Sequence, residues 1–420
     1  MIYIIIGLIA VLLCPSVVFP FALLGYITSY NSRSILRYCF ILSIFFAILG
    51  FCFKNPASDP DLVRYLAILA QYEGKSLFES FNLVYSNLYA VDIVFWMISQ
   101  SGSPQLLPAF ACFIYYFVIL YILGDYKVES SIRISYFVIY LLFTIASTLV
   151  GSIINGIRWP MAFSLFLLAI YCDLYKNKKN VFTFILYIIS FFMHFSVIGL
   201  IAVRLLMILK NKKIVITLSL LVTILPQLIS ALASKIGGMS STIGIINSII
   251  YFINRSNMYF KWDNGGWVDI VNKSSYYKIE KYYYIVISAM LMVILILAIK
   301  KYTAQGRRTI NDIQPIYIFS FTYIMLTFVT FLIASHVYIR FVTPAIPLFS
   351  IMTFDYCHEG DRDRSGSEFL ISKNKLILVI FLTALAIVGF YLNHHFLSMM
   401  IDTKQYTVDI FLFNVFKLFE

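Results

Sequence analysis

Charged residues are scarce in this chain. They make up 12% of its 420 residues, about half the share found in soluble domains. Hydrophobic residues account for 61%, and the mean hydropathy is +0.87. These values exclude a soluble globular enzyme, a disordered chain and a fibrous protein. We therefore expect an all-α polytopic membrane protein, because helices satisfy their own backbone hydrogen bonds inside a bilayer.

Metal-binding and disulfide motifs are also missing. The six cysteines lie in or beside apolar stretches and include no CxxC pair, and the five histidines include no HExxH motif. This spacing argues against a structural zinc site and against a disulfide. We expect no metal and no other cofactor.

Acidic residues are few, 20 against 32 basic residues, which gives a net charge of +12. In a soluble protein that excess would suggest a nucleic-acid partner, but short cytoplasmic loops of membrane proteins also collect lysine and arginine. We therefore interpret the charge as a sign of topology and expect no nucleic acid. The basic residues that mark the first three inner turns are Arg33, Arg37, Lys127, Arg133, Lys176, Lys178 and Lys179.

Long apolar runs dominate what is present. A span needs about 20 such residues, and the runs predict about 11 spans, or about 12 if one hairpin is counted twice. We expect a single integral membrane domain over 1–420, with a first outer loop at 54–104 that includes an interfacial helix, and a long outer loop at 237–281. The predicted spans are 2–28, 36–53, 105–123, 134–153, 158–175, 181–209, 213–235, 282–299, 314–334, 341–356 and 376–393.

The segment 181–209 does not fit a straight span. As one helix it would be about 43 Å long, against an apolar core of about 30 Å, and basic residues flank both of its ends. A broken or re-entrant helical hairpin that turns near His194 and Ser196 keeps both flanks inside. His194 is then a candidate base or hydrogen-bond donor. The alternative is a neutral histidine that satisfies a carbonyl of the broken helix.

Two predicted spans begin on the outer side with an arginine and carry a proline in their first turns. They start at Arg158, with Pro160, and at Arg340, with Pro344. Unpaired N–H groups and the dipole at a helix start favour an anion, and a guanidinium adds a bidentate phosphate contact. The pattern predicts two anion-binding helix ends, with His336 near the second. The alternative is that both arginines extend to lipid headgroups.

The first outer loop carries Asp59, Asp61, Arg64 and Tyr65 within a few residues. Two carboxylates two positions apart can bind a divalent metal or supply a base. The alternative is a solvated acidic turn, in which Pro60 stops one helix and Asp61 caps the next.

The long outer loop is rich in aromatic and polar residues. Trp262 and Trp267 flank Asp263 and Asn264, a combination that suits a sugar, because aromatic faces pack on its ring and polar groups bond its hydroxyls. The alternative is an aromatic belt at the membrane interface, which accounts better for the tyrosines at 282–284.

At these residues the sequence resembles the EpsG-like and Wzy-type polysaccharide polymerases of bacterial cytoplasmic membranes. Each motif is short, and their order along a polytopic chain carries the resemblance. The residues after Arg158, Trp159 and Pro160, depart from the polar residue expected there. The similar points are Asp61 with Tyr65 in the first outer loop, 155–169 led by Arg158, 191–200 around His194, and the late Arg340.

This resemblance implies a specific reaction. Such enzymes transfer a growing glycan from undecaprenyl diphosphate onto a hydroxyl of a newly flipped lipid-linked repeat unit, on the outer face of the membrane. The implied partners are the lipid-linked oligosaccharide donor and acceptor and the membrane lipids, with a flippase and a chain-length regulator beside them. For this reaction we expect catalysis from His194 and Asp61, diphosphate binding by Arg158, Arg340 and Arg64, and sugar binding by Tyr65, Trp262, Trp267, Asp263 and Asn264.

Three other functions remain open. A metal-dependent lipid-linked glycosyltransferase would use Asp59 and Asp61, and an O-antigen-type ligase would transfer finished chains. A lipid-oligosaccharide flippase or another transporter is a non-enzymatic alternative. Proton-coupled carriers usually place carboxylates inside their spans, whereas Asp173 and Asp355 lie at predicted helix ends and only Asp92 is ambiguous, which weighs against transport.

Overall fold

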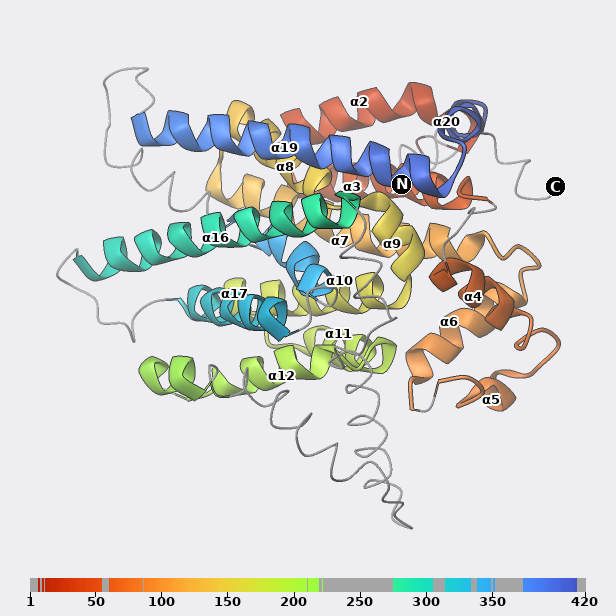
Figure 1. The fold of residues 1–420 in the computed structure, drawn as a ribbon, viewed down its shortest axis with the longest axis horizontal. Helices are drawn as coiled ribbons and strands as arrows, with labels where there is room; N and C mark the ends of the chain where they lie inside the picture. Colours follow the sequence, from red (N-terminus) through yellow and green to blue (C-terminus); the bar gives the residue numbers. More distant parts are fainter. Residues whose placement is uncertain are drawn as a thin grey trace, which may run out of the picture. The chain divides into compact units, whose positions relative to one another are not determined.

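The protein is an all-α polytopic membrane protein (Figure 1). The computed structural model describes residues 12–54, 60–85, 87–209, 211–218, 275–304, 314–333, 338–348 and 373–413, with isolated positions 7, 10, 221, 350 and 351. Within these ranges the chain is 83% helical and has no strand. Four described helical segments are long and apolar enough to cross a membrane, or five with one bent pair, and the four are Ser32–Phe51, Leu106–Ser130, Tyr276–Lys300 and Leu376–Met400.

Several predicted spans coincide with observed helices. Helix α10 (Arg158–Ile170) continues directly into a π-helical turn, η1 (Tyr171–Tyr175), so that together they cover the predicted segment 158–175. The other matching helices are α2 (Pro15–Thr28), α3 (Ser32–Phe51), α7 (Leu106–Ser130), α17 (Pro315–Ile333) and α19 (Lys373–Met400). Most of 213–235 and part of 341–356 lie outside the described residues, so the full number of spans stays a prediction.

The chain divides into two compact units. Unit 1 comprises Met1–Val197 and Ile346–Glu420, and unit 2 comprises Ile198–Ala345. In unit 2, α16 (Ser275–Ala304) packs on α17. The Tyr338 hydroxyl donates to the Tyr284 carbonyl at 2.8 Å and lies 2.6 Å from the Ser288 hydroxyl, which ties the segment around Tyr338 to α16. Because α16 begins at Ser275, the end of the predicted loop 237–281 is helical.

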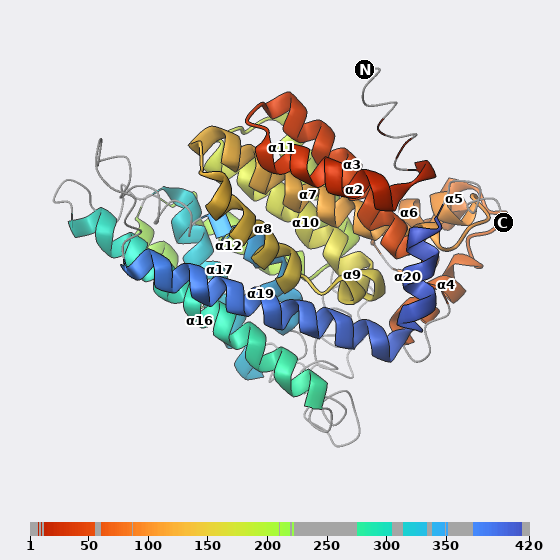
Figure 2. The ribbon, with the colours of Figure 1, turned by 90° about the horizontal axis from the view of Figure 1, so that it is seen from above.

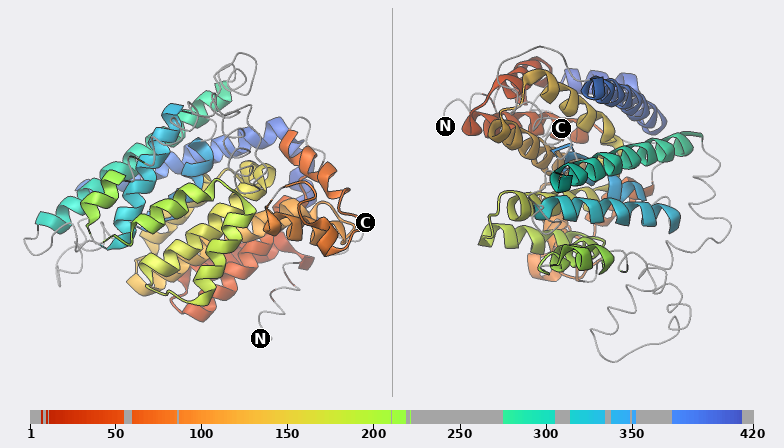
Figure 3. Two further views of the ribbon diagram at one scale, coloured as in Figure 1. Left: turned by 90° about the horizontal axis from the view of Figure 1, so that it is seen from below. Right: turned by 90° about the vertical axis from the view of Figure 1, so that its left-hand side faces the viewer.

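Unit 1 is built around closely packed long helices. Figure 2 shows α3, α7 and α10 running side by side. Helix α11 (Val181–Met193) returns antiparallel along α10, and Figure 3 shows this yellow-green pair from below. The Phe166 and Tyr187 rings meet at 5.5 Å, and the Tyr187 hydroxyl donates to the Asp173 carboxylate at 2.9 Å. Since the connection is short, the start of α10 and the end of α11 lie at the same end of the pair.

The three predicted inner turns of unit 1 lie together at one end. The Lys127 ammonium, near the end of α7, donates to the carbonyls of Tyr26 and Ile27 at 2.8 and 2.9 Å. Lys176, just after η1, pairs with Glu129 at 2.6 Å. These contacts join the turns that follow α2, α7 and η1, as the basic residues predict. Which side of the membrane this end faces stays a prediction.

The predicted span 134–153 is interrupted. Helix α8 (Ile134–Ser147) and α9 (Val150–Gly156) are bent by 47°. The side chain of Asn393, on α19, donates to the Ala146 carbonyl and accepts from the Val150 N–H, both at 2.8 Å. These are backbone groups that the break would otherwise leave unpaired in an apolar environment. The sequence predicts a span here but not its break, because the side chain that satisfies the break is 243 positions away along the chain.

A second interruption falls where the sequence predicts it. Helix α11 ends at Met193, His194 has extended dihedrals of φ −158° and ψ 120°, and α12 (Val197–Leu206) begins three residues later. The break near His194 and Ser196 is confirmed, whereas the reversal of direction that a hairpin requires stays a prediction.

The predicted outer segment 54–104 contains three short helices. They are α4 (Pro60–Leu69), α5 (Leu77–Ser80) and α6 (Tyr89–Ser99), which gather at one end of the long unit 1 helices in Figure 1. Ser76 and Glu79 form a reciprocal capping box at the start of α5, a local device that begins a helix without help from packing.

Candidate functional site

The backbone is strained immediately before Arg158. Ile157, between α9 and α10, has φ +38° and ψ −72°, and a β-branched residue at positive φ is a true outlier. Its strained turn separates the two helices and lets Arg158 begin α10. Gly156 precedes it, and a Cβ there would collide with the indole of Trp159. Strain of this kind is held by the surrounding structure and is concentrated at functional sites.

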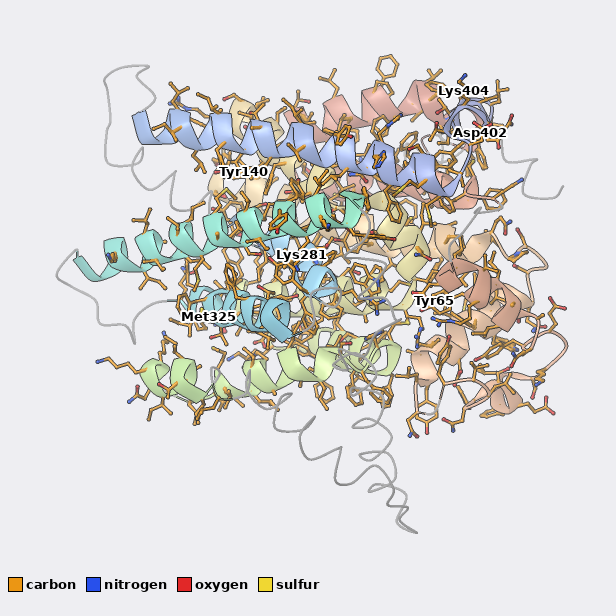
Figure 4. All side chains as sticks on the ribbon, in the orientation of Figure 1. Tyr65, Tyr140, Lys281, Met325, Asp402 and Lys404 are labelled. Carbon is orange, nitrogen blue, oxygen red and sulfur yellow. The ribbon has the colours of Figure 1, made fainter. Side chains whose placement is uncertain are left out.

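Arg158 lies against two tyrosines of the outer segment. Its side chain is 8% exposed, and its Nε donates to the Tyr65 hydroxyl at 3.2 Å. The guanidinium carbon is 4.0 Å from the centre of the Tyr85 ring and 5.4 Å from that of Tyr65. Tyr65 is on α4 and is labelled in Figure 4. The structure therefore brings Tyr65 and Arg158 together, two residues that carry the predicted site.

Tyr85 belongs to this site although its sequence neighbourhood does not indicate it. It follows α5 in an irregular stretch, and no motif distinguishes it from the many other tyrosines. Its position depends on the backbone on either side of it, where Asn82 and Asn87 both have positive φ, a conformation that asparagine tolerates better than most residues. The Asn87 N–H donates to the Asn82 side chain at 2.7 Å, which closes this stretch on itself.

Asn155, three residues before Arg158, holds the start of α4 in place. The Leu62 N–H, one of the unpaired donors of the first turn, donates to the Asn155 side chain at 2.9 Å. Asp61 pairs with Arg64 at 2.7 Å across one turn of α4. The Asp61 carboxylate and the Arg64 guanidinium thus lie on the helix that carries Tyr65, beside the start of α10.

Phe95 of α6 organises the aromatic groups around Arg158. Its ring lies 6.0 Å from Tyr65, 5.9 Å from Tyr72 and 6.0 Å from Tyr85, each edge to face. Such geometry is the favoured arrangement for aromatic pairs. Two of these three tyrosines contact Arg158, so α6 supports the aromatic groups that surround the arginine.

A buried carboxylate on α6 holds the outer segment together. Asp92 is completely buried, and its two oxygens accept from the Tyr72 hydroxyl at 2.7 Å and from the Asn82 N–H at 2.9 Å. Burial raises the pKa of the Asp92 carboxyl, and these two hydrogen bonds oppose the shift. Trp96 and Gln100, one and two turns further along, donate to backbone carbonyls of the same stretch at 2.9 and 3.1 Å.

His194 lies at the same end of unit 1 as Arg158, because α10 and α11 are antiparallel. The Phe192 ring is 5.5 Å from the ring of Tyr89, so the end of α11 packs against the start of α6. The His194 Nδ1 lies 2.8 Å from the Ser196 hydroxyl and accepts from the Ser196 N–H at 3.2 Å. The histidine predicted to be catalytic therefore shares a region with the predicted aspartate, tyrosine and arginine elements.

The remaining predicted residues fall into two groups. Arg340 lies in the helical segment 338–348 and is partly exposed. It belongs to unit 2, so its distance from Arg158 stays open. The positions outside the described residues are Asp59, Trp262, Asp263, Asn264, Trp267 and His336.

Two further observations concern possible metal ligands and related proteins. Within the described residues, no group of three or more His, Cys, Asp or Glu side chains is arranged to hold a metal ion. Comparisons with protein-family models, with curated proteins and with solved structures found no match to this chain. The features of the molecule that bear on function are a buried guanidinium at a helix start, tyrosine rings against it, and a carboxylate and an imidazole at the same end.

Proposed function

We propose that this protein is a membrane-embedded glycosyltransferase that joins undecaprenyl-diphosphate-linked oligosaccharide repeat units into a long surface polysaccharide. The reaction would take place on the outer face of the bacterial cytoplasmic membrane. One observation carries the proposal: the buried Arg158 guanidinium, at the start of α10, contacts Tyr65 of the helix that bears Asp61. Those are the elements in which the sequence resembles polysaccharide polymerases.

The chemistry requires a cation for the leaving group. The acceptor hydroxyl attacks the anomeric carbon of the donor glycan, and the bond from that carbon to the diphosphate oxygen breaks. The electron pair departs with the lipid diphosphate, and the proton of the hydroxyl passes to a base. Arg158 would stabilise the departing diphosphate together with the N–H groups of the first turn of α10. Arg340 and Arg64 are candidates for further charge compensation.

Two groups are candidates for the base. Asp61 lies one turn from Tyr65 and pairs with Arg64, and His194 lies at the same end of unit 1. Tyr65 is only 4% exposed, and the guanidinium groups of Arg64 and Arg158 lie over its ring. It is therefore placed to position Arg158 and not to bind a sugar, as the resemblance had led us to expect. We assign the sugar contacts to the long outer loop, with Trp262, Trp267, Asp263 and Asn264.

Replacing Arg158 with Ala tests the proposal directly. We expect polymer formation by the purified protein from lipid-linked repeat units to fall at least about 100-fold, the usual cost of removing one group that stabilises transition-state charge. Arg158→Lys should restore little, because an ammonium lacks the planar bidentate donor. Arg133→Ala is the matched control, since this exposed arginine precedes α8 at the opposite end.

The same preparation separates the competing functions. Long polymer at the wild-type rate from Arg158→Ala protein would reject the proposal. A loss of activity in excess chelator that only magnesium or manganese restores would instead favour a metal site at Asp59 and Asp61. We expect no such loss. Transfer of one finished chain per acceptor would indicate a ligase, and movement of lipid-linked repeats across vesicles without polymer would indicate a transporter.

A further inference from the structure

The Nδ1 nitrogen of His194 faces two groups of Ser196. It lies 3.2 Å from the Ser196 backbone nitrogen, with the N–H directed at it, and 2.8 Å from the Ser196 hydroxyl. A backbone N–H can only donate. The Nδ1 atom must therefore present a lone pair, and the rotatable hydroxyl can donate to the same atom.

This arrangement fixes the tautomer. A neutral imidazole carries one proton, and when Nδ1 is the acceptor the proton is on Nε2. Nε2 is then an N–H donor and has no lone pair with which to accept a proton. Protonation at Nδ1 would set an N–H against the Ser196 N–H, so that atom is also a poor destination for a proton.

We infer that His194 donates a hydrogen bond through Nε2 to an anionic oxygen of the lipid diphosphate, and that Ser196 is the positioning residue that holds this tautomer. The inference rests on the proposed function. In its support, the end of α11 lies at the same end of unit 1 as the Arg158 guanidinium and packs against α6. A neutral donor stabilises the departing charge without transferring a proton.

The assignment also decides which group is the base. With His194 as a donor, the proton of the acceptor hydroxyl passes to the Asp61 carboxylate. The Arg64 guanidinium, 2.7 Å from Asp61, holds that carboxylate at the start of α4. Bond changes balance, since the diphosphate leaves with its electron pair and Asp61 takes the proton.

The tautomer can be measured without any activity. Full-length protein labelled with 15N-histidine in lipid nanodiscs gives ring nitrogen signals, and the signal missing from His194→Gln protein identifies His194. We expect protonated Nε2 and unprotonated Nδ1 at neutral pH, and a reduced share of this form in Ser196→Ala, which keeps the N–H but loses the hydroxyl. A proton on Nδ1, or on both nitrogens, would overturn the inference even if the enzyme is a polymerase.

The role is tested by a pair of amide replacements. The glutamine amide nitrogen falls near the position of Nε2, whereas that of asparagine falls near Nδ1. We expect His194→Ala and His194→Asn to lose about 10- to 100-fold of the polymerisation rate, as for one hydrogen bond to a charged group, and His194→Gln to recover most of it. Equal inactivity of the glutamine and alanine variants would contradict the donor role. If wild-type protein forms no polymer, the proposed function fails while the nitrogen signals still decide the tautomer.

Discussion

In the described part of unit 1, a buried cation lies near each end, and the surroundings of these two cations differ. Lys127, at the end that holds the basic turns, donates to two carbonyls of the last turn of α2 and faces the rings of Tyr30 and Phe137 at 4.8 and 4.7 Å. Arg158, at the other end, contacts the Tyr65 hydroxyl and two tyrosine rings.

The difference indicates different purposes. Carbonyls at the end of a helix carry partial negative charge and belong to the scaffold, so they satisfy an ammonium permanently. Tyrosine rings and a hydroxyl position a guanidinium without carrying a full negative charge themselves. Arg158 is also held next to a strained turn, where Ile157 has φ +38°. We interpret Lys127 as a structural cation and Arg158 as a functional one.

The largest effect on stability is expected at Lys127. Lys127→Ala removes two charge-assisted hydrogen bonds and leaves the end of α2 without its partner, which should cost about 3 kcal/mol of folding free energy. Thermal unfolding in detergent measures the loss, and Lys178→Ala, an exposed lysine of the same end, is the control. The rate per folded molecule should stay near wild type. A loss of rate without loss of stability would contradict the comparison.

Gly156→Ala should affect the other end. The added Cβ collides with the Trp159 indole, and overpacking of this kind costs about 1–3 kcal/mol. Because Trp159 adjoins Arg158, the polymerisation rate should fall as well. Gly199→Ala is a matched control, since a Cβ there meets nothing within 4 Å, and alanine is the better helix former. Wild-type rate and stability in Gly156→Ala would show that the turn tolerates displacement.

The smallest effect on stability is expected from Asp92→Asn, because the effect at this position depends on the replacement. Asp92→Leu leaves the Asn82 N–H and the Tyr72 hydroxyl without their acceptor, at about 1–3 kcal/mol. Asp92→Asn should cost under about 1 kcal/mol, because its amide oxygen can accept from Asn82 and its NH₂ can donate to Tyr72. Trp96→Phe removes a different hydrogen bond from α6 to the same segment and serves as the comparison.

Folding stability is also expected to depend on pH through Asp92, and the Asp92→Asn variant is the reference for this effect. Burial raises the pKa of this carboxyl in the folded protein, so its contribution to stability is complete below the ordinary aspartate pKa of about 4 and is lost as the pH rises through the raised folded value. We therefore expect the unfolding temperature of wild type to fall relative to that of Asp92→Asn as the pH rises from acidic to neutral. The opposite trend would mean that the ionised carboxylate is the stabilising form.

Part of the candidate site could be predicted from local sequence. An arginine at the start of an apolar run anticipates the start of α10 at Arg158, and the basic flanks of 181–209 anticipate the break at His194. Tyr85 and Asp92 could not be assigned, because their partners are reached only when α4, α5 and α6 pack around Phe95. Lys127 was interpreted as a loop marker, yet it is fully buried against α2, a contact between segments 100 residues apart.

The sequence by itself determined the membrane class, the helical content and the positions of most described helices, because hydrophobicity and charge act over single runs of about 20 residues. Only the tertiary structure decided that Asn393 satisfies the break between α8 and α9, and that two tyrosines from the outer segment cover Arg158. Those contacts join segments that are distant along the chain. Buried backbone groups and charges in an apolar environment need a polar partner, and the packing of the helices determines which residue supplies it.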